Sequence, residues 1–393
     1  MKILITDGLD EEGKNIFAEK GYEITDRKIK AEDLPELVKG YDALVVRSAT
    51  KATREVIESA DQLKIIGRSG VGVDNIDLEA ALERGIVVKN APDGNTNAAA
   101  ELTVGLMLAI ARSMPQAYHA LNRGTWKKKQ FDGIELLGKT LGIIGYGRIG
   151  STVAERLSGF RMNVLVYDPF RQQETGVNYT DLDTLLKQSD FVTLHTPKLK
   201  GTIDGKIGKE QLEMMKKTAY LINASRGGNV KEADLYQALQ TGRIAGAAFD
   251  VFEEEGKEGQ PYSNRLFELP NFVGIPHLGA STREAQLRTS IQIAENIVRY
   301  LDLGDMAYAV NINGAVDCAW KKETSNLYIG HENQPGMIAA ITGVLGRHGI
   351  NLESVPAATA DGRAITIIRA YSVIPDNAIT EIRAIPGVYR IVK

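Results

Sequence analysis

The chain has 393 residues, of which 43% are hydrophobic and 25% are charged, and its formal net charge is −3. This length predicts two or three domains, and the near-neutral charge gives no reason to expect a nucleic acid or an anionic membrane as partner. The single cysteine, Cys318, cannot form an internal disulfide, which favours a reducing cytoplasm. No apolar run is long enough for a membrane span, and the first residues become acidic too early for a signal peptide.

Residues 1–95 alternate short apolar runs with amphipathic segments. Strands are predicted at 3–6, 43–47, 64–67 and 86–89, with helices between them at 11–20, 31–39, 54–60 and 77–84. This alternation is typical of a parallel sheet covered by helices on both faces.

Two arginines follow strands of this predicted sheet. Arg47 comes at the end of the second strand, and Arg68 after the third, where Ser69 and Gly70 continue the loop. Parallel sheets bind ligands at the carboxyl ends of their strands, so both guanidinium groups are candidates for holding an anionic substrate. The alternative is that they are solvated surface side chains.

A glycine-rich turn stands in the middle of the chain. The apolar strand 140–144 leads into Gly145, Gly147 and Gly150, which have G-x-G-x-x-G spacing and open an amphipathic helix. A second strand then ends at Asp168, 18 residues after Gly150. Glycines at these positions admit a pyrophosphate to a helix N-terminus, and the acidic residue accepts hydrogen bonds from a ribose. Because a carboxylate repels a 2′-phosphate, the pattern predicts NAD rather than NADP.

Four further predicted strands end in polar clusters on the same sheet edge. They lie at 191–194, 218–223, 244–249 and 272–275. His277 is the best proton carrier among the residues that follow them, and Arg226 could hold a substrate carboxylate. One of the glutamates at 253–255 could orient the imidazole, and the sequence leaves the choice among the three open. Together with NAD, this set fits oxidation of a 2-hydroxy acid. The alternative is a structural histidine and solvated glutamates.

The tail shows a different order of predicted strands and helices. After a predicted linker at 313–322, residues 323–393 show a βαββαβ order, which is typical of a ferredoxin-like module.

The motifs GRSGVGVDNID, LGIIGYGRIG, LINASRGGNV, IAGAAFDVFEEE and PHLGAST occur in this order. Over residues 1–320 the chain resembles the D-isomer-specific 2-hydroxyacid dehydrogenases. The resemblance implies that Arg226 clamps the substrate, that His277 is the catalytic acid and base, and that Glu255 pairs with His277. Relatives usually have a proline after that glutamate, where this chain has Gly256.

The family's architecture implies a flavodoxin-like substrate-binding domain, residues 1–97 and 281–312, around an NAD-binding Rossmann domain, residues 98–280. It implies an active site in the interdomain cleft and a homodimer. Substrate contacts are implied for Arg47, Arg68, Ser69, Gly70, Arg226 and His277. Cofactor contacts are implied for Val71, Gly145, Gly147, Arg148, Ile149, Gly150, Asp168, Thr196, Ala224, Ser225, Arg226, Asp250, His277 and Gly279. No metal site is expected.

The tail is similar to an ACT domain, a module that commonly binds amino acids. With such a tail, the resemblance implies NAD-dependent oxidation of D-3-phosphoglycerate to 3-phosphohydroxypyruvate, the first step of L-serine biosynthesis. It also implies serine feedback through His331, Asn333 and Asn351, and a homotetramer if two tails pair. Turn capping is the alternative role for these three residues. The competing functions are oxidation of another D-2-hydroxy acid, such as glycerate or lactate, and NAD sensing without catalysis.

Overall fold

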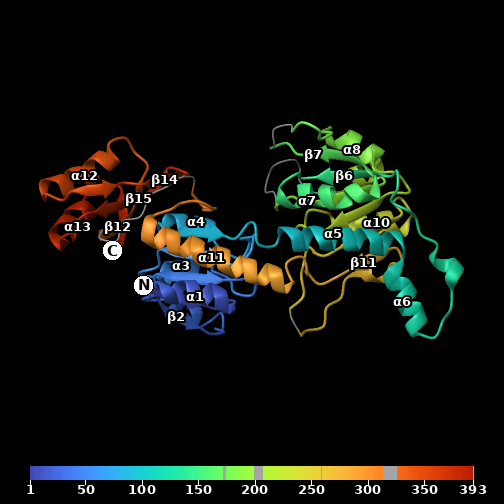
Figure 1. Cartoon of the computed structure of the whole chain (residues 1–393), viewed down its shortest axis with the longest axis horizontal. Helices are drawn as coiled ribbons and strands as arrows, with labels where there is room; N and C mark the ends of the chain where they lie inside the picture. The colour runs from blue at the N-terminus through green and yellow to red at the C-terminus, as the bar shows by residue number, and fades with distance from the viewer. Residues whose placement is uncertain (171–173, 199–206, 258, 313–324, 393) are drawn as a thin grey trace. The chain divides into compact units, whose positions relative to one another are not determined.

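The computed structural model describes residues 1–170, 174–198, 207–257, 259–312 and 325–392. The chain divides into two compact units, residues 1–94 with 286–393 and residues 95–285 (Figure 1). We call them unit 1 and unit 2. The predicted linker at 313–322 and Cys318 lie outside the described residues.

Unit 1 begins with a five-stranded parallel sheet in the order β2-β1-β3-β4-β5. Its strands are β1 (Lys2–Ile5), β2 (Glu23–Asp26), β3 (Ala43–Val46), β4 (Ile65–Arg68) and β5 (Val87–Asn90). The helices are α1 (Glu11–Glu19), α2 (Leu34–Leu37), α3 (Arg54–Ser59), α4 (Leu78–Glu83) and the long α11 (Arg283–Leu303). This strand order is the flavodoxin-like one, which confirms the predicted fold class. The sequence did not predict β2, because this edge strand has no buried residue and so no apolar run.

Unit 2 holds a six-stranded parallel sheet in the order β11-β10-β9-β8-β6-β7. Its strands are β6 (Thr140–Ile144), β7 (Asn163–Tyr167), β8 (Phe191–Leu194), β9 (Tyr220–Asn223), β10 (Gly246–Phe249) and β11 (Phe272–Gly274). The helices are α5 (Thr96–Ala111), α6 (Met114–Asn122), α7 (Arg148–Leu157), α8 (Leu182–Gln188), α9 (Lys209–Met214) and α10 (Glu232–Gln240), with short 3₁₀ turns at Lys128–Phe131, Ser158–Phe160 and Arg265–Glu268. The predicted Rossmann-type parallel sheet is confirmed. The strand order reverses between β6 and β8, which is where such sheets bind their ligands.

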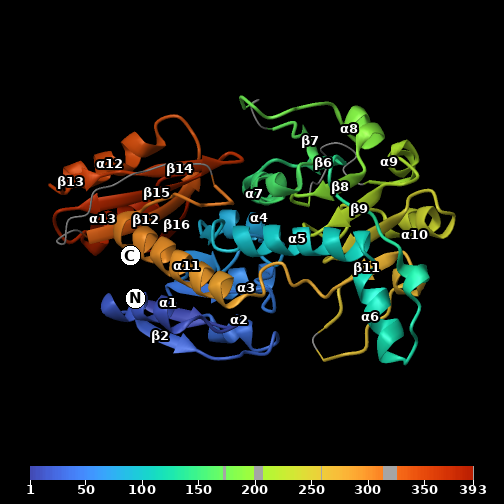
Figure 2. The ribbon, with the colours of Figure 1, turned by 45° about the vertical axis from the view of Figure 1, so that its right-hand side comes forward.

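Helix α5 packs against α7 in unit 2, as Figure 2 shows. Its buried side chains include Ala100, Leu106 and Met107, which join the core under the β6 strand. This agrees with the apolar character of the segment and fixes α7, the helix that follows the glycine turn.

The tail forms an antiparallel sheet in the order β13-β15-β12-β16, with β14 paired to β15. Its elements are β12 (Ser325–Glu332), α12 (Met337–Arg347), β13 (Leu352–Ser354), β14 (Ala357–Ala360), β15 (Arg363–Ala370), α13 (Asp376–Arg383) and β16 (Val388–Val392). The predicted βαββαβ order is confirmed. The strand that this order predicts directly after its first helix is divided into two strands, β13 and β14, because Pro356 between them has no N–H for the ladder.

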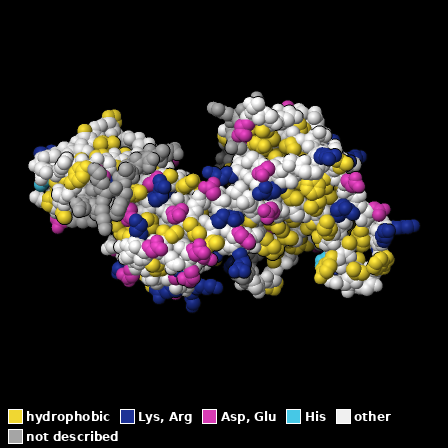
Figure 3. Space-filling view, viewed as in Figure 1, with side chains coloured by type: hydrophobic (Ala, Val, Ile, Leu, Met, Phe, Trp, Pro, Cys, Tyr) yellow, Lys and Arg dark blue, Asp and Glu magenta, His cyan; other side chains and the backbone are white. Residues whose placement is uncertain are grey.

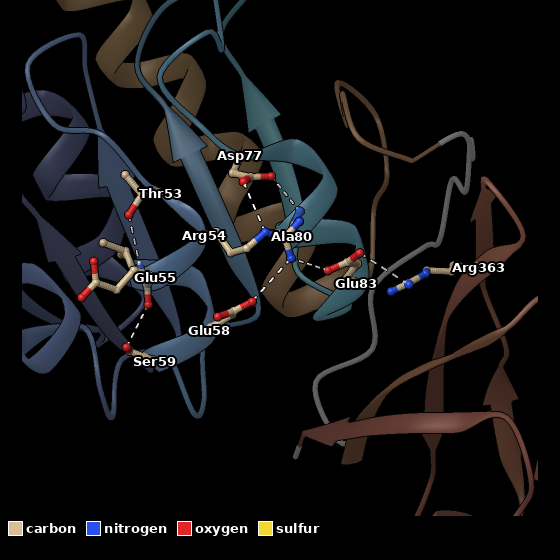
Figure 4. Close-up of polar contacts among 10 residues, drawn as sticks. Thr53, Arg54, Glu55, Glu58, Ser59, Asp77, Ala80, Glu83 and Arg363 are labelled. Carbon is tan, nitrogen blue, oxygen red and sulfur yellow. Dashed lines mark hydrogen bonds and ion pairs between the residues drawn. The ribbon is translucent and has the colours of Figure 1, made fainter.

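Within unit 1 the tail shares a core with the preceding segment. Tyr328 and Ile367 belong to the same buried cluster as Ile297 of α11, and the Tyr328 hydroxyl donates to the Leu301 carbonyl at 2.7 Å. Figure 4 shows a polar contact within unit 1, where Glu83 at the end of α4 pairs with Arg363 of β15 at 3.7 Å.

The surface carries charges of both signs. Figure 3 shows acidic and basic side chains interspersed on the visible face. In the described part of the chain, no helix combines the length and the apolar character that a membrane crossing needs. Over the same residues, no group of three or more His, Cys, Asp or Glu side chains is arranged to hold a metal ion.

Candidate active site

The glycine turn follows β6 and is packed too tightly for side chains. Gly145 has a φ of +89°, and a Cβ there would lie 2.7 Å from the carbonyl oxygen of His195. A Cβ on Gly150 would lie 2.1 Å from the carbonyl oxygen of Gly145. At Gly147, by contrast, no described atom lies within 4 Å of the Cβ position. This residue has no side chain to cap α7, so the helix offers N–H groups and open space to a pyrophosphate.

Asp168 stands beside this turn at the end of β7. Its Oδ2 accepts the N–H of Tyr146 at 2.8 Å, and its Oδ1 accepts the N–H of Phe170 at 3.0 Å. A carboxylate oxygen accepts more than one hydrogen bond, so both oxygens can also bind ribose hydroxyls. The fixed negative charge disfavours a 2′-phosphate. These residues therefore fit NAD.

His195 and Thr196 follow β8, the strand on the other side of the point where the strand order reverses. The Nε2 of His195 lies 3.0 Å from the Thr193 hydroxyl, and burial lowers the pKa of His195 to about 3, so the ring is neutral. Its Nδ1 is buried, with no hydrogen-bond partner among the described residues. An orphaned polar atom beside the glycine turn is a second observation that fits a ligand there.

The loop that carries Arg226 is held by two buried asparagines. Asn223, the last residue of β9, accepts from the hydroxyl of Ser225 at 2.8 Å and donates to the carbonyl of Arg226 at 3.0 Å. Asn229 donates to the carbonyl of Thr196 at 3.0 Å, which joins this loop to the one after β8. Sequence reasoning missed both asparagines. The signal available in the sequence was the presence of an asparagine on either side of Arg226, which follows the end of β9.

Gly227 brings the Arg226 loop against the loop that follows β10. A Cβ on Gly227 would lie 1.7 Å from the carbonyl oxygen of Phe252, so no other residue fits there without moving the backbone. The function of this glycine was also missed, because its close contact is formed by a residue distant in the sequence.

His277 and Glu255 are paired in unit 2. The Nδ1 of His277 lies 3.0 and 2.9 Å from the two carboxylate oxygens of Glu255. An ionised carboxylate only accepts, so Nδ1 carries a proton and Nε2 is the ring atom left to exchange one. Of the three glutamates that the sequence left open, Glu255 is the one that reaches the imidazole.

The charges around His277 favour its protonated form. The hydrogen bond to Glu255, and the charges of Glu255 and Asp250, raise the pKa of His277 above 6.5, while burial and the charge of Arg226 oppose them. Because the charge of Arg226 acts on the pKa of His277, its guanidinium lies close enough to interact electrostatically with the imidazole. An imidazole that can exchange a proton and a cationic side chain therefore act on one another within unit 2.

Asp250, which follows β10, holds the backbone of His277. Its carbonyl accepts the His277 N–H at 2.8 Å, and its carboxylate accepts the N–H groups of Leu278 at 2.6 Å and Gly279 at 2.8 Å. Burial raises the pKa of Asp250, and these N–H groups and His277 oppose the rise. The φ of His277 is +52°, a value that non-glycine residues rarely adopt, so these bonds hold a strained turn.

The candidates for substrate contacts other than Arg226 and His277 lie in unit 1, together with Val71. The guanidinium of Arg68 donates to the Ser69 carbonyl at 3.1 Å and lies over Gly70, where a Cβ would be 1.4 Å from its Nη1. The Ser69 hydroxyl is buried and has no hydrogen-bond partner among the described residues. The guanidinium of Arg47 donates to the side chain of Gln286. Val71 is half-buried, and its carbonyl accepts from Asn90 at 2.7 Å.

The effector candidates in the tail differ in exposure. The Nδ1 of His331 lies 2.8 Å from the Glu332 carbonyl, which can only accept, so Nδ1 donates and Nε2 accepts from the Thr366 hydroxyl at 2.8 Å. Burial lowers the pKa of His331, so its ring is neutral. Both ring nitrogens are therefore used inside the fold, whereas Asn333 and Asn351 are exposed.

Residues 104–279 match the NAD-binding domain of the D-isomer specific 2-hydroxyacid dehydrogenases, and residues 325–387 match the ACT domain. The hydroxypyruvate reductase of Thermotoga maritima is 42% identical over 304 residues, which cover 77% of this chain and 99% of that protein. The chain therefore belongs to the D-isomer specific 2-hydroxyacid dehydrogenase family. Its carboxyl-terminal module is an ACT domain.

Several other relatives are 3-phosphoglycerate dehydrogenases. The D-3-phosphoglycerate dehydrogenase of Methanocaldococcus jannaschii is 50% identical over 306 residues, which cover 77% of this chain. The chain spans only 57% of the length of that relative. The NAD⁺-bound 3-phosphoglycerate dehydrogenase of Entamoeba histolytica is 29% identical with a TM-score of 0.67, over 80% of this chain and 99% of that one.

Proposed function

We propose that the chain is an NAD-dependent dehydrogenase that oxidises D-3-phosphoglycerate to 3-phosphohydroxypyruvate, the first step of L-serine biosynthesis. The observation that best supports this function is the hydrogen-bonded pair of His277 and Glu255. This pair lies in the same unit as a glycine turn that fits NAD. The phosphoglycerate dehydrogenases among the relatives support this choice of substrate. The single cysteine supports a cytoplasmic location.

NAD, when bound, supplies the hydride acceptor. Arg226 binds the substrate carboxylate through paired N–H donors and polarises the group beside it. The Nε2 of His277 takes the proton of the C2 hydroxyl as the C2 hydride leaves, and the carbonyl forms. Glu255 keeps the proton on Nδ1 and stabilises the imidazolium that results. In the reverse reaction the same imidazolium returns the proton.

We assign phosphate and carboxylate contacts in unit 1 to Arg47, Arg68, Ser69 and Gly70. The orphaned Ser69 hydroxyl and the cationic Arg68 beside it support this assignment. In unit 2, cofactor contacts are assigned to the glycine turn with Arg148 and Ile149, to Asp168, and to the strand-end residues Thr196, Ala224, Ser225, Asp250 and Gly279. Val71 is assigned to the same role from unit 1. The corresponding domains are residues 1–97 with 281–312, residues 98–280, and the ACT domain from 323.

Serine is the proposed effector, and the exposed amides of Asn333 and Asn351 are its proposed ligands. An amide both donates and accepts, so two of them can bind the carboxylate and ammonium of an amino acid. His331 supports the site as a fixed neutral ring within the sheet.

A homodimer or homotetramer is the proposed assembly. Three apolar side chains of α6 are 50–61% exposed, namely Met114, Tyr118 and Leu121. Such a cluster is typical of a surface that a second copy covers. Sedimentation of the wild type and of the Met114→Ser, Leu121→Ser double variant tests this, because a monomeric wild type contradicts it.

A second candidate keeps the chemistry and changes the substrate. The Thermotoga relative, which this chain covers almost completely, is named a hydroxypyruvate reductase. The product of hydroxypyruvate reduction is D-glycerate, which lacks the phosphate. Turnover of D-3-phosphoglycerate, D-glycerate and D-lactate under the same conditions separates the two functions. Equal rates with the phosphorylated and free acids would remove the first proposal.

Catalysis is tested against NAD sensing with His277→Ala. We expect turnover to fall by about 10²–10⁴-fold while NAD still binds, because the glycine turn and Asp168 are unchanged. A protein that only senses NAD has no turnover to lose, so an inactive wild type with intact NAD binding would favour that alternative.

A further inference from the structure

The loop between Asp250 and Asn264 carries Glu255 and has an unusual composition. Gly256 follows the glutamate, and glycine is the residue that restrains a backbone least. The side chains of His277 and Glu255 are 48% and 41% exposed, so water competes for their hydrogen bond. Something other than the backbone at 256 must therefore hold Glu255 in place.

Tyr262 is one such restraint. Its hydroxyl donates to the carbonyl of Glu254 at 2.7 Å, one residue before the glutamate that pairs with His277. Its ring packs edge-on against Phe252 at 6.0 Å and Phe267 at 5.8 Å between centroids. A Cβ on Gly256 would lie 3.0 Å from the Cβ of Tyr262, so the tyrosine occupies the space that a side chain at 256 would need.

Glu232, the first residue of α10, is the other restraint. One of its carboxylate oxygens accepts the N–H of Glu253, and the other accepts the side-chain amide of Asn264 at 2.7 Å. Asn264 in turn caps the 3₁₀ turn that begins at Arg265, through the N–H of Leu266 at 3.0 Å. One carboxylate thus ties both ends of the loop to a helix of the Rossmann core.

We propose that Tyr262 and Glu232 are positioning residues for Glu255, and through it for the imidazole of His277. They supply the rigidity that the backbone at Gly256 lacks. The kinetic part of this inference rests on the proposed function, whereas the titration below does not.

The direct test is an NMR titration of His277, which a His277→Ala spectrum identifies among the five histidines of the chain. The charged groups that act most strongly on this ring are Glu255, Asp250 and Arg226, and all three remain in Tyr262→Phe and Glu232→Ala. We expect the pKa of His277 to fall in each variant toward its value in Glu255→Gln, and further in the double variant. The loss of one hydrogen bond should lower kcat about 3- to 10-fold while KM for NAD stays constant.

Two controls separate positioning from a general loss of structure. Tyr236→Phe removes the hydroxyl of another tyrosine in unit 2, whose partner is Gln240, and should leave both the titration and kcat unchanged. In a Glu255→Gln background, Tyr262→Phe should have no further effect on the pKa of His277.

The proposal is overturned if the pKa of His277 is the same in wild type, Tyr262→Phe and Glu232→Ala, or if Tyr262→Phe costs as much activity in the Glu255→Gln background. If the wild-type histidine titrates high and shifts as expected but no dehydrogenase activity is found, the proposed function fails and the positioning role stands.

Discussion

Asp250 holds His277 in a left-handed backbone conformation by accepting three consecutive N–H groups, one at its carbonyl and two at its carboxylate. The strain is local to His277, whose φ is +52°. The imidazole of His277 is thus positioned from both ends, since its backbone is fixed by Asp250 and its Nδ1 by Glu255.

This arrangement predicts different stabilities for two variants that both lack the imidazole. His277→Gly should unfold at a higher temperature than His277→Ala, because glycine adopts a positive φ without the cost of about 1 kcal/mol that alanine incurs. Both should lose activity to the same extent. Equal stabilities, measured by thermal or urea unfolding, would show that the turn relaxes in solution.

Asp250→Asn tests the other partner. An asparagine has one side-chain oxygen, so one of the two N–H groups at 278 and 279 loses its acceptor inside a buried site. A loss of about 1–3 kcal/mol in the free energy of unfolding is expected, with a fall in kcat as the turn moves. Asp183→Asn, at an exposed position of α8, is a matched control that should change neither quantity.

Glu255→Gln should move the pH dependence of the reaction. The raised pKa of His277 delays formation of the neutral base, so wild-type oxidation rises with pH around a value above 6.5. Without the carboxylate this rise should shift to lower pH. The reduction reaction needs the imidazolium, so its rate, which falls as the pH rises, should begin to fall at a lower pH than in the wild type. Rate profiles in both directions measure the shift, and unchanged midpoints would remove Glu255 from the mechanism.

The same pair predicts a change in stability with pH. A histidine whose pKa is raised by folding stabilises the folded state fully below its unfolded value of about 6.5. That contribution is lost as the pH rises through the folded value. The difference in unfolding midpoint between wild type and Glu255→Gln should therefore be larger at pH 6 than at pH 9.

Asp168→Ala should weaken NAD binding and reduce the preference for NAD over NADP. The variant loses both the ribose acceptors and the charge that repels a 2′-phosphate, and it removes the carboxylate that accepts the N–H of Tyr146 beside the glycine turn. Dissociation constants for the two cofactors, measured by titration, give the ratio. Asp168→Asn keeps one acceptor without the charge. It should therefore restore the affinity for NAD more than it restores the preference for NAD over NADP.

Gly227→Ala should abolish most activity. Its Cβ would lie 1.7 Å from the Phe252 carbonyl oxygen, so the loop of Arg226 and the loop of Glu255 must separate. Gly159→Ala provides the matched control, because no described atom lies within 4 Å of that Cβ position. We expect kcat to fall only in the first variant, and wild-type turnover there would contradict the close packing.

Feedback should depend on the two exposed asparagines. Serine should inhibit the wild type, and Asn333→Ala with Asn351→Ala should relieve inhibition while basal turnover remains. His331→Ala should instead lower the unfolding temperature of the tail, because Glu332 and Thr366 lose a buried partner. If the asparagine variants remain fully sensitive to serine, the effector binds elsewhere.

The sequence determined by itself those features that depend on short-range patterns. The glycines at 145, 147 and 150 and Asp168 lie within one strand-helix-strand segment, so their spacing alone predicts what they can bind. The parallel and antiparallel sheets likewise follow from a local property, the order of apolar runs and amphipathic segments along the chain. An edge strand such as β2 escapes this reasoning, since its side chains are not buried.

Only the tertiary structure decided which partners meet across distant segments. It selected Glu255 from three adjacent glutamates, assigned Asp250 to the backbone of His277, placed Gly227 against Phe252, and engaged both nitrogens of His331 within the sheet. A periodic pattern records which face of an element is buried, but not the residue that it contacts. Hydrogen bonds and close backbone approaches depend on distances of a few tenths of an ångström, which packing alone sets.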